Sequence, residues 1–398
     1  MRKPMVPTRR QFLGYSSSAL VGLAAFPSSR AKADAAEFKV GMFLPQGGPA
    51  SIFLAGGRAC AELAVDEVNA GGGISGRKVR LVFADGGVAP AEAAKSAIRL
   101  ILDERVEIIT GSHDGGVREA LVSAIKGKVP YVFSPVTENG NCSANTYYLG
   151  ETAQQQNEII FDALVKPRNL KSFYLVGNDY SWPRAVNENS KKFIAESGGK
   201  IVGEEYVPFG TPNRFEEIVT RIKSVNPDVI LITLVGGDNV TFNRTFGAFG
   251  TDGRILRVGY LLEEQTLAGI GADGSRNLFS ALGYFSTAPG GAGDQFKQAF
   301  SAKFGETSPQ LFAQVGTIGV DSYAAVHFAR ALIAKAGSTK ARDCMAASEG
   351  LSFTTATGPA VMMHRYVNRT MYLAECKGTT FSVVATKEGV RNESSCKT

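Results

Sequence analysis

From Phe38 onward, short apolar runs alternate with longer amphipathic segments, and this regular order restricts the fold more than any other feature of the chain. Such runs, bounded by turn residues, are typical of buried strands, and the segments between them have the period of helices. We expect strands at 38–44, 78–84, 106–110 and 129–134, and helices at 51–69, 91–103 and 117–126. Alternating strands and helices predict a parallel sheet with helices on both faces.

A second series of the same kind follows residue 150. Strands are expected near residues 173, 201, 229, 255 and 278, with helices near 183, 214, 240 and 263. This series is too regular to be an insertion loop, and the chain of 398 residues is long enough for two separate cores. The sequence therefore predicts an α/β protein with two doubly wound parallel-sheet lobes.

The first 33 residues have the pattern of an export signal. The pair Arg9-Arg10 precedes a modestly apolar stretch at 18–26, and the small-x-small sequence Ala31-Lys32-Ala33 predicts cleavage before Asp34. The alternative is a membrane anchor, but the apolar stretch is far shorter than the ~20 residues that span a bilayer. We therefore expect a twin-arginine signal peptide and a mature protein in the periplasm, without direct membrane insertion.

The positive net charge belongs to this leader. It holds six of the 43 basic residues and no acid, so the mature chain carries 37 basic and 37 acidic residues. A neutral balance gives no support for binding to nucleic acid or to an anionic membrane surface. We expect neither partner.

The five cysteines are odd in number, so at least one lacks a partner within the chain. Their spacings match no metal-binding pattern. Cys376 and Cys396 flank an expected strand pair, and a disulfide between them is one possibility for fastening the tail. The sequence leaves the pairing open.

No catalytic or cofactor motif holds in its context. The run 71–76 contains Gly-x-Gly-x-x-Gly, but it follows an expected helix and opens a strand, the reverse of a dinucleotide site. Nucleophile-elbow, zinc-protease and phosphate-loop sequences are missing, and the three histidines lie far apart in sequence. We expect no enzyme activity, no cofactor and no metal.

The stretch 173–187 combines an apolar run, a turn and a helix start. Tyr180 and Trp182, the chain's single tryptophan, lie in the turn. In open α/β sheets the loops at the carboxyl ends of strands line the ligand crevice, which predicts that both rings form part of a wall. The alternative is that they only seal the strand–helix junction.

A family resemblance rests on two segments. Residues 178–187, Asn-Asp-Tyr-Ser-Trp-Pro-Arg-Ala-Val-Asn, resemble the Asp-Tyr-x-aromatic-Pro-Arg-x-x-Asn segment of periplasmic binding proteins for urea and short-chain amides. Residues 69–76 resemble the Asn-Ala-x-Gly-Gly-Ile-x-Gly turn of the wider branched-chain amino-acid and amide receptor family. These receptors serve ATP-binding-cassette (ABC) importers. The resemblance, which covers about 38–386, implies the type I periplasmic binding protein fold, with three crossings between lobes.

The resemblance places the crossings near 147–151, 285–289 and 354–359. It divides the mature chain into lobe 1, residues 34–150 plus 287–356, and lobe 2, residues 151–286 plus 357–398. A hairpin is expected in the tail, with strands at 371–376 and 381–386.

The resemblance also implies which loops hold the ligand. Two lobe 1 loops are expected to grip its polar head, and strand-end residues of lobe 2 complete the site. The expected contacts are Ser112, His113, Asp114, Gly115, Val136, Thr137, Glu138, Tyr180, Trp182, Asp238 and Tyr260.

Several of these residues have a second interpretation. His113 is either a pH-sensitive ligand partner or an exposed loop histidine, and the sequence favours neither. Asp114 and Asp238 are better explained as helix N-caps. Tyr260 aligns where amino-acid-binding relatives carry an acid for the ligand's ammonium group, although Glu263 or Glu138 could supply that charge instead.

These observations predict the solute-binding component of an ABC importer, which closes over its solute and presents it to inner-membrane permease subunits. The expected solute is a small amide, a urea-like compound or an amino-acid-like compound. Small aromatic acids are an alternative class of solute, and a ligand-sensing periplasmic receptor is an alternative role.

Overall fold

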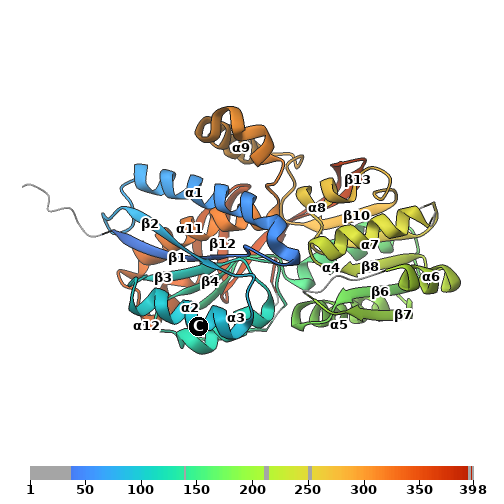
Figure 1. Ribbon diagram of the computed structural model, residues 1–398, viewed down its shortest axis with the longest axis horizontal. Coiled ribbons are helices and arrows are strands. Elements are labelled where there is room, and N and C mark those ends of the chain that lie inside the picture. Colours follow the sequence, from blue (N-terminus) through green and yellow to red (C-terminus); the bar gives the residue numbers. More distant parts are fainter. Residues whose placement is uncertain (1–36, 139, 210–214, 250–252, 393–395, 397–398) are drawn as a thin grey trace, which may run out of the picture. The chain divides into compact units, whose positions relative to one another are not determined.

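The computed structural model describes residues 37–138, 140–209, 215–249, 253–392 and 396. The expected signal peptide, residues 1–33, lies outside these residues. None of the described helices combines the length and apolar character that crossing a bilayer requires. The described strands form one continuous hydrogen-bonded path, in which a long shared strand joins two mainly parallel sheets flanked by helices (Figure 1).

Lobe 1 contains a parallel sheet in the order β2, β1, β3, β4, β5. Its strands are β1 Phe38–Leu44, β2 Val79–Asp85, β3 Ile108–Gly111, β4 Tyr131–Phe133 and β5 Thr146–Tyr148. Its main helices are α1 Leu54–Ala70, α2 Pro90–Leu102, α3 Gly115–Ile125, α11 Thr317–Ala336 and α12 Ala341–Ser348, with a 3-10 turn at Pro49–Phe53 before α1. The expected α/β alternation of this lobe is confirmed.

Side chains of β1 alternate between the two faces of the sheet, as the pleat of a strand requires. Val40, Met42 and Leu44 pack into a core with α1 and α11, whereas Phe43 joins another core with α2 and α3. Figure 1 shows α1 on one side of this sheet and α2 and α3 on the other. Both faces are covered, which explains why β1 is a nearly continuous apolar run.

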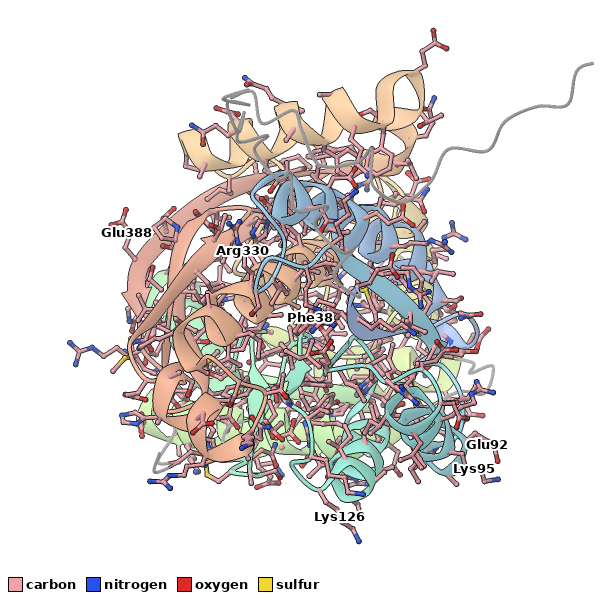
Figure 2. All side chains as sticks on the ribbon, turned by 90° about the vertical axis from the view of Figure 1, so that its left-hand side faces the viewer. Phe38, Glu92, Lys95, Lys126, Arg330 and Glu388 are labelled. Carbon is pink, nitrogen blue, oxygen red and sulfur yellow. A yellow bond between two sulfur atoms is a disulfide. The ribbon has the colours of Figure 1, made fainter. Side chains whose placement is uncertain are left out.

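Charged side chains lie mainly on the outer faces of the helices. On α2, Lys95 Nζ lies 2.8 Å from Glu92 Oε1 with both side chains exposed, and Lys126 at the end of α3 is also exposed (Figure 2). Phe38 of β1, in contrast, is buried. Exposed ion pairs contribute roughly 0–1 kcal/mol, so the apolar cores hold the lobe together.

Lobe 2 repeats the design with the parallel order β7, β6, β8, β9, β10. Its strands are β6 Ser172–Asn178, β7 Lys200–Val207, β8 Val229–Thr233, β9 Leu256–Gly259 and β10 Leu278–Leu282. Its helices are α4 Ala153–Ile160, which continues as one π-helical turn, α5 Ser181–Glu196, α6 Glu216–Val225, α7 Gly237–Ala248 and α8 Glu264–Ile270. All five residues of β8 are buried, as expected for a central parallel strand.

The first two passages between the lobes lie near the expected places. The chain leaves lobe 1 after β5 and enters lobe 2 at α4, which begins with a capping box between Thr152 and Gln155. It returns after β10 to α9 Gly291–Phe304 and the short α10 Ser308–Phe312, where Phe296 and Phe300 pack into the lobe 1 core.

The third passage differs from the expectation. Residues 354–359 are the closed end of a hairpin between β11 Leu351–Thr355 and β12 Gly358–Met363, and this hairpin extends the lobe 1 sheet. Gly358 has φ 111°, a conformation that favours glycine and lets the chain reverse. The expected start of the second lobe 2 segment at residue 357 is therefore too early.

The chain crosses within β13 Tyr366–Lys377 instead. Tyr366 pairs with Tyr148 of β5, and seven residues later Leu373 pairs with Ala281 of β10 in the lobe 2 sheet. The expected tail hairpin is confirmed, since β14 Thr380–Val390 folds back along β13.

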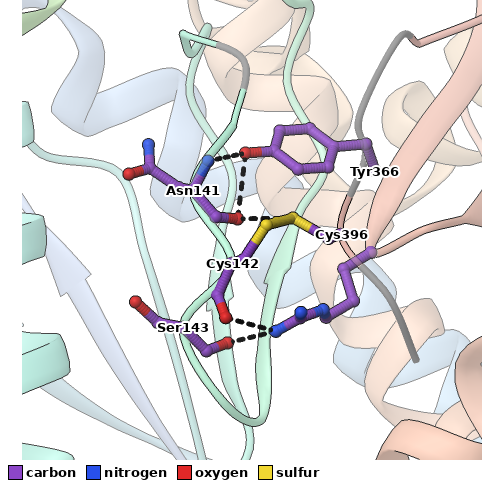
Figure 3. The surroundings of a disulfide bond; sticks show 6 residues. Asn141, Cys142, Ser143, Tyr366 and Cys396 are labelled. Carbon is purple, nitrogen blue, oxygen red and sulfur yellow. Dashed lines mark hydrogen bonds between the residues drawn. A yellow bond between two sulfur atoms is a disulfide. The ribbon is translucent and has the colours of Figure 1, made fainter.

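The disulfide joins Cys142 to Cys396, so a bond between Cys376 and Cys396 is wrong. Cys376 lies on β13 with its side chain buried in the lobe 2 core, whereas Cys396 reaches back to lobe 1. Arg365 strengthens this attachment, because its Nη1 donates to the carbonyls of Cys142 at 3.0 Å and Ser143 at 2.6 Å (Figure 3). Cys60, Cys344 and Cys376 are free and buried.

A buried ionic cluster joins the three passages. Arg369 of β13 contacts Glu151, at the first passage, with Nη1–Oε1 2.8 Å, and Asp321 of α11 with Nη2–Oδ1 2.9 Å. Glu151 Oε1 also accepts hydrogen bonds from Thr317 Oγ1 at 2.7 Å and from the N–H of Gly283, at the second passage, at 2.5 Å. The three passages are therefore linked by charged contacts as well as by apolar packing.

Asp321 makes this cluster sensitive to pH. Burial, together with the charge of Glu151, raises the pKa of Asp321 to about 7 despite its contact with Arg369. The folded state thus holds the proton more tightly than the unfolded state, where an aspartate has a pKa of about 3.9. The stability that this group contributes is complete below about pH 4 and is lost as the pH rises to about 7.

Asp321→Asn is expected to flatten the decline of the free energy of unfolding between about pH 4 and pH 7, by an amount of up to about 4 kcal/mol. Denaturant unfolding at a series of pH values measures this slope. Asp273→Asn, at an exposed turn residue, is the control and should keep the wild-type slope. Equal slopes in wild type and Asp321→Asn would contradict the assignment.

Candidate ligand-binding site

A cavity of about 330 Å³ lies between the strand-end loops of the two lobes. Lobe 1 supplies the loops after β1, β2, β3 and β4, and lobe 2 supplies the segments after β6, β7, β8 and β9, with Ile318 of α11 completing the wall. All these loops follow the carboxyl ends of parallel strands, the edge where ligands bind in open α/β sheets.

The structure brings most of the sequence-predicted site residues to this cavity. The wall includes Ser112, His113, Asp114, Gly115, Val136, Glu138, Tyr180 and Trp182. Thr137, Asp238 and Tyr260 are not among the residues that line it. Contact of any of these residues with a ligand stays a prediction.

Tyr260 lies away from the cavity because it packs into lobe 2. Its side chain is fully buried, and its hydroxyl is hydrogen-bonded to Ser190 Oγ at 3.0 Å and to Asn157 Oδ1. Asp238 lies in the first turn of α7 and accepts a hydrogen bond from Asn178 Nδ2 at 2.6 Å. The N-cap of α7 is Gly236, so the expected capping role of Asp238 is wrong. Both residues therefore have structural partners within lobe 2.

Glu263, the other acid considered near Tyr260, also has a hydrogen-bond partner within the protein. Glu263 is fully buried, and its Oε2 accepts a hydrogen bond from the backbone N–H of Ile318 at 3.0 Å, in the first turn of α11. Burial, followed by the charges of Glu264 and Glu151, raises its pKa well above the ordinary value. Glu263 is not among the cavity-lining residues.

Thr137 and Asp114 serve the local backbone. Thr137 is buried and donates from Oγ1 to the carbonyl of Glu138 at 3.2 Å. Asp114 is the N-cap of α3 and accepts from the N–H of Val117 at 3.0 Å, which confirms the capping interpretation. Asp114 also lines the cavity, so the same residue caps α3 and forms part of the cavity wall.

His113 is not an exposed loop histidine. Its side chain is 6% exposed, its Nδ1 donates to the carbonyl of Asp114 at 3.0 Å, and its Nε2 accepts from the hydroxyl of Tyr131 at 2.8 Å. Burial lowers the pKa of His113 to about 4. The imidazole is therefore neutral at neutral pH and adds no positive charge to the wall.

Arg118 is a cavity residue that the sequence analysis missed. It lies one turn into α3 with a side chain only 2% exposed, and it forms a two-point ion pair with Glu138, Nη1–Oε2 3.0 Å and Nη2–Oε1 2.5 Å. Burial alone would raise the pKa of Glu138, but the hydrogen bonds and charge of Arg118 hold it below the ordinary value. An arginine inside an amphipathic helix gives no signal in the sequence that it faces a cavity.

Aromatic rings line the cavity from both lobes. Tyr180 and Trp182 are adjacent in lobe 2, with ring centroids 6.4 Å apart, and Phe209 lies 4.9 Å from Tyr180. Phe53 and Phe133 contribute rings from lobe 1, which the sequence analysis did not anticipate. The wall is therefore aromatic on both sides rather than on one.

Trp182 is both a core residue and a wall residue. It is 3% exposed and packs in the lobe 2 core, and its indole N–H lacks a hydrogen-bond partner among the described residues. A buried donor without an acceptor is unfavourable, so an acceptor atom on a solute would be stabilising there.

The lobes approach each other closely beside the cavity. A Cβ atom added to Gly115 of α3 would lie 2.4 Å from Ser181 Oγ of α5. One added to Gly236, at the N-terminus of α7, would lie 2.0 Å from the carbonyl oxygen of Pro49 in lobe 1. Glycine at these positions permits contact between the lobes.

Two α/β lobes joined by three chain passages, with a cavity at their facing strand ends, define a class of two-lobed binding proteins. Residues 37–380 match the family model described as periplasmic binding protein, and the chain belongs to this family.

Among its relatives is Leu/Ile/Val-binding protein homolog 7 of Brucella abortus (strain 2308), 30% identical over 237 residues that cover 56% of this chain. The match spans only 58% of that relative's length. Leu/Ile/Val-binding protein homolog 3 of Brucella melitensis is 25% identical over 334 residues, which cover 82% of this chain and 88% of that protein.

Solved structures share the fold. An ABC-transporter solute-binding protein from Rhodopseudomonas palustris BisB5, in complex with 3,4-dihydroxybenzoic acid, has a TM-score of 0.78 at 20% identity and covers 90% of this chain and 99% of its own. The branched-chain amino-acid transporter substrate-binding protein LivJ from Streptococcus pneumoniae, in complex with isoleucine, has a TM-score of 0.75 at 21% identity, with coverages of 88% and 99%.

Proposed function

We propose that this chain is the solute-binding component of an ABC importer and works outside the cytoplasm. The observation that carries the proposal is the cavity of about 330 Å³ enclosed by strand-end loops of both lobes. Family membership supports the role, and residues 1–33 would supply the export signal, by the twin-arginine route. The partners would be a small solute and, transiently, the permease subunits of the importer.

The cavity favours a solute with an apolar or aromatic body. Its walls carry Phe53, Phe133, Tyr180, Trp182 and Phe209 around a volume of about 330 Å³. Urea would leave most of this space empty, so a larger amide or amino-acid-like compound fits better. Small aromatic acids are a second class that the ring-lined walls favour.

Binding would work through closure of the lobes. A solute shifts the equilibrium toward the closed form only if it binds that form more tightly than the open one. Contacts from both lobes to a single cavity supply that difference, and the ionic cluster at Glu151, Asp321 and Arg369 marks where the chain would bend. The closed form would then be presented to the permease.

A screen of amides, amino acids and small aromatic acids should find a solute that stabilises the purified protein. At about 100 times its dissociation constant, the solute should add ~2.7 kcal/mol to the free energy of unfolding. It should also change the fluorescence of Trp182, which is the single tryptophan.

Trp182→Leu should then weaken binding of that solute by about tenfold or more, measured by calorimetry, because stacking on the ring is lost. Phe249→Leu, at a partly exposed ring that does not line the cavity, should leave the affinity unchanged. A complete screen without any stabilising solute would count against the proposed function.

A further inference from the structure

The lobe 1 wall of the cavity contains two positive features, and a carboxylate of the chain occupies each of them. The first is the N-terminus of α3, where unpaired N–H groups carry a partial positive charge. Asp114 caps this end by accepting from the N–H of Val117 at 3.0 Å. A carboxylate on a solute would meet the negative charge of Asp114 there.

The second positive feature is Arg118. Its guanidinium is buried over the ring of Phe133, with Cζ 5.2 Å from the ring centroid, and both of its terminal nitrogens are hydrogen-bonded to the carboxylate of Glu138. A planar guanidinium binds one carboxylate in this two-point manner, and Glu138 already fills that geometry. Glu119 Oε1, 3.6 Å from Nη2, approaches the same group from the solvent side.

The rest of the described wall offers uncharged donors. Among the lining residues that the structure describes, Arg118 carries the one full positive charge, because His113 is neutral. The indole N–H of Trp182 lacks an acceptor, and the N-terminus of α5 has no side-chain cap. Such donors suit the carbonyl oxygen of an uncharged group. A free carboxylate would bring a full negative charge, which the partial positive charge at the N-terminus of α5 offsets only in part.

We propose that Glu138 is a specificity-determining residue that occupies Arg118 and thereby directs the cavity to solutes with an uncharged acyl head, an amide or an ester, in preference to free carboxylates. This inference rests on the proposed function and names the substrate class for the same cavity. The apolar body of the solute contacts the rings, and its carbonyl oxygen accepts from neutral donors.

Pairs of compounds with the same shape but different charge test the selectivity of the wild-type protein. Benzamide and benzoate, phenylacetamide and phenylacetate, and leucinamide and leucine are titrated by calorimetry and by Trp182 fluorescence. For at least one pair, the neutral or amidated member should bind about tenfold or more tightly than its carboxylate counterpart. The proposal is overturned if the wild-type protein binds any of these acids and no amide binds more tightly than its partner acid.

Glu138→Gln tests the mechanism, because it releases Arg118 while keeping the shape of the side chain. This variant should gain affinity for benzoate by about tenfold or more, and the ratio of benzoate affinity to benzamide affinity should rise with it. Glu119→Gln removes a carboxylate near the same guanidinium but outside the cavity, and should behave as wild type. No gain of benzoate affinity in a folded Glu138→Gln protein overturns the proposal.

Folding and the proposed function are tested separately. If Glu138→Gln does not fold, the double variant Arg118→Met/Glu138→Met removes both buried charges and is expected to fold without any gain of benzoate binding. A gain in the double variant would overturn the role of Arg118, and the wild-type pairs decide the selectivity in either case. A gain of benzoate binding in Glu138→Gln supports the masking of Arg118, whatever the outcome of the broad screen. A screen that finds no solute for the wild-type protein would count against the proposed function alone.

Discussion

Gly236→Ala is expected to weaken solute binding by about ten- to hundredfold, because it prevents the two lobes from meeting. Gly236 has φ 54° and ψ −121°, a conformation that only glycine adopts readily, and an alanine Cβ would lie 2.0 Å from the carbonyl oxygen of Pro49 in the opposite lobe. That neighbour is backbone and cannot turn aside. The collision exists only when the lobes are in contact, so the closed form loses stability relative to the open form, and each 1.4 kcal/mol lost is tenfold in affinity.

Gly237→Ala is the matched control, since a Cβ at the adjacent residue meets nothing within 4 Å. Calorimetry with the solute found in the screen gives the affinities, and small-angle scattering gives the radius with and without it. Wild type and Gly237→Ala should become more compact on binding, whereas Gly236→Ala should stay extended. Normal affinity and compaction in Gly236→Ala would show that contact at Pro49 is not needed for binding.

The sheets were predictable from the sequence because their signals are local. In β1 the residues Val40, Met42 and Leu44 face one core and Phe43 faces the other. A strand that is buried on both faces therefore appears in the sequence as a continuous apolar run. The same holds for β8, which is buried throughout. The turn after β6 was predictable as part of the cavity wall because strand order alone brings Tyr180 and Trp182 to the edge where the strands end.

The errors concern features that depend on contacts between distant segments. The Cys142–Cys396 bond joins residues 254 positions apart, and proximity in sequence to a hairpin favoured Cys376 instead. The third passage was predicted at a Gly-Pro turn. The chain instead changes sheets within β13, which pairs first with β5 of lobe 1 and then with β10 of lobe 2. Tyr260 follows β9 as a site residue would, but its hydroxyl is hydrogen-bonded to Ser190 inside lobe 2 and it does not line the cavity, so its contact with a ligand stays a prediction.

Contacts between buried charged residues were also not predictable from the sequence. Arg118 and Glu138 are 20 positions apart, and neither has an unusual sequence context. Glu151 and Arg369 lie 218 positions apart and meet only because the first and third passages are adjacent. Apolar periodicity indicates which faces are buried, but it cannot indicate which buried charges will find each other.

Arg369→Met is expected to lower the free energy of unfolding by about 3–5 kcal/mol, because it leaves Glu151 and the ionised fraction of Asp321, whose pKa is about 7, without their cation. The side chains of Glu151 and Asp321 are 0% and 4% exposed, and each contacts Arg369 within 3 Å. A side chain at position 283 would collide with this ion pair, since a Cβ added to Gly283 would lie 2.7 Å from Glu151 Oε1 and 2.8 Å from Arg369 Nη1. Denaturant unfolding near neutral pH measures the loss.

Lys387→Met is the matched control, because Lys387 also bridges two acids, Glu158 at 2.9 Å and Asp162 at 3.0 Å, but on the surface, where its side chain is 39% exposed. Its replacement should lower the free energy of unfolding by only about 0–1 kcal/mol. The triple variant Arg369→Met/Glu151→Gln/Asp321→Asn should recover part of the loss, since no uncompensated charge remains buried. If Arg369→Met destabilises no more than Lys387→Met, the three passages are held by apolar packing alone. If it destabilises strongly and the triple variant recovers stability, the buried charges fix how the passages meet at the hinge.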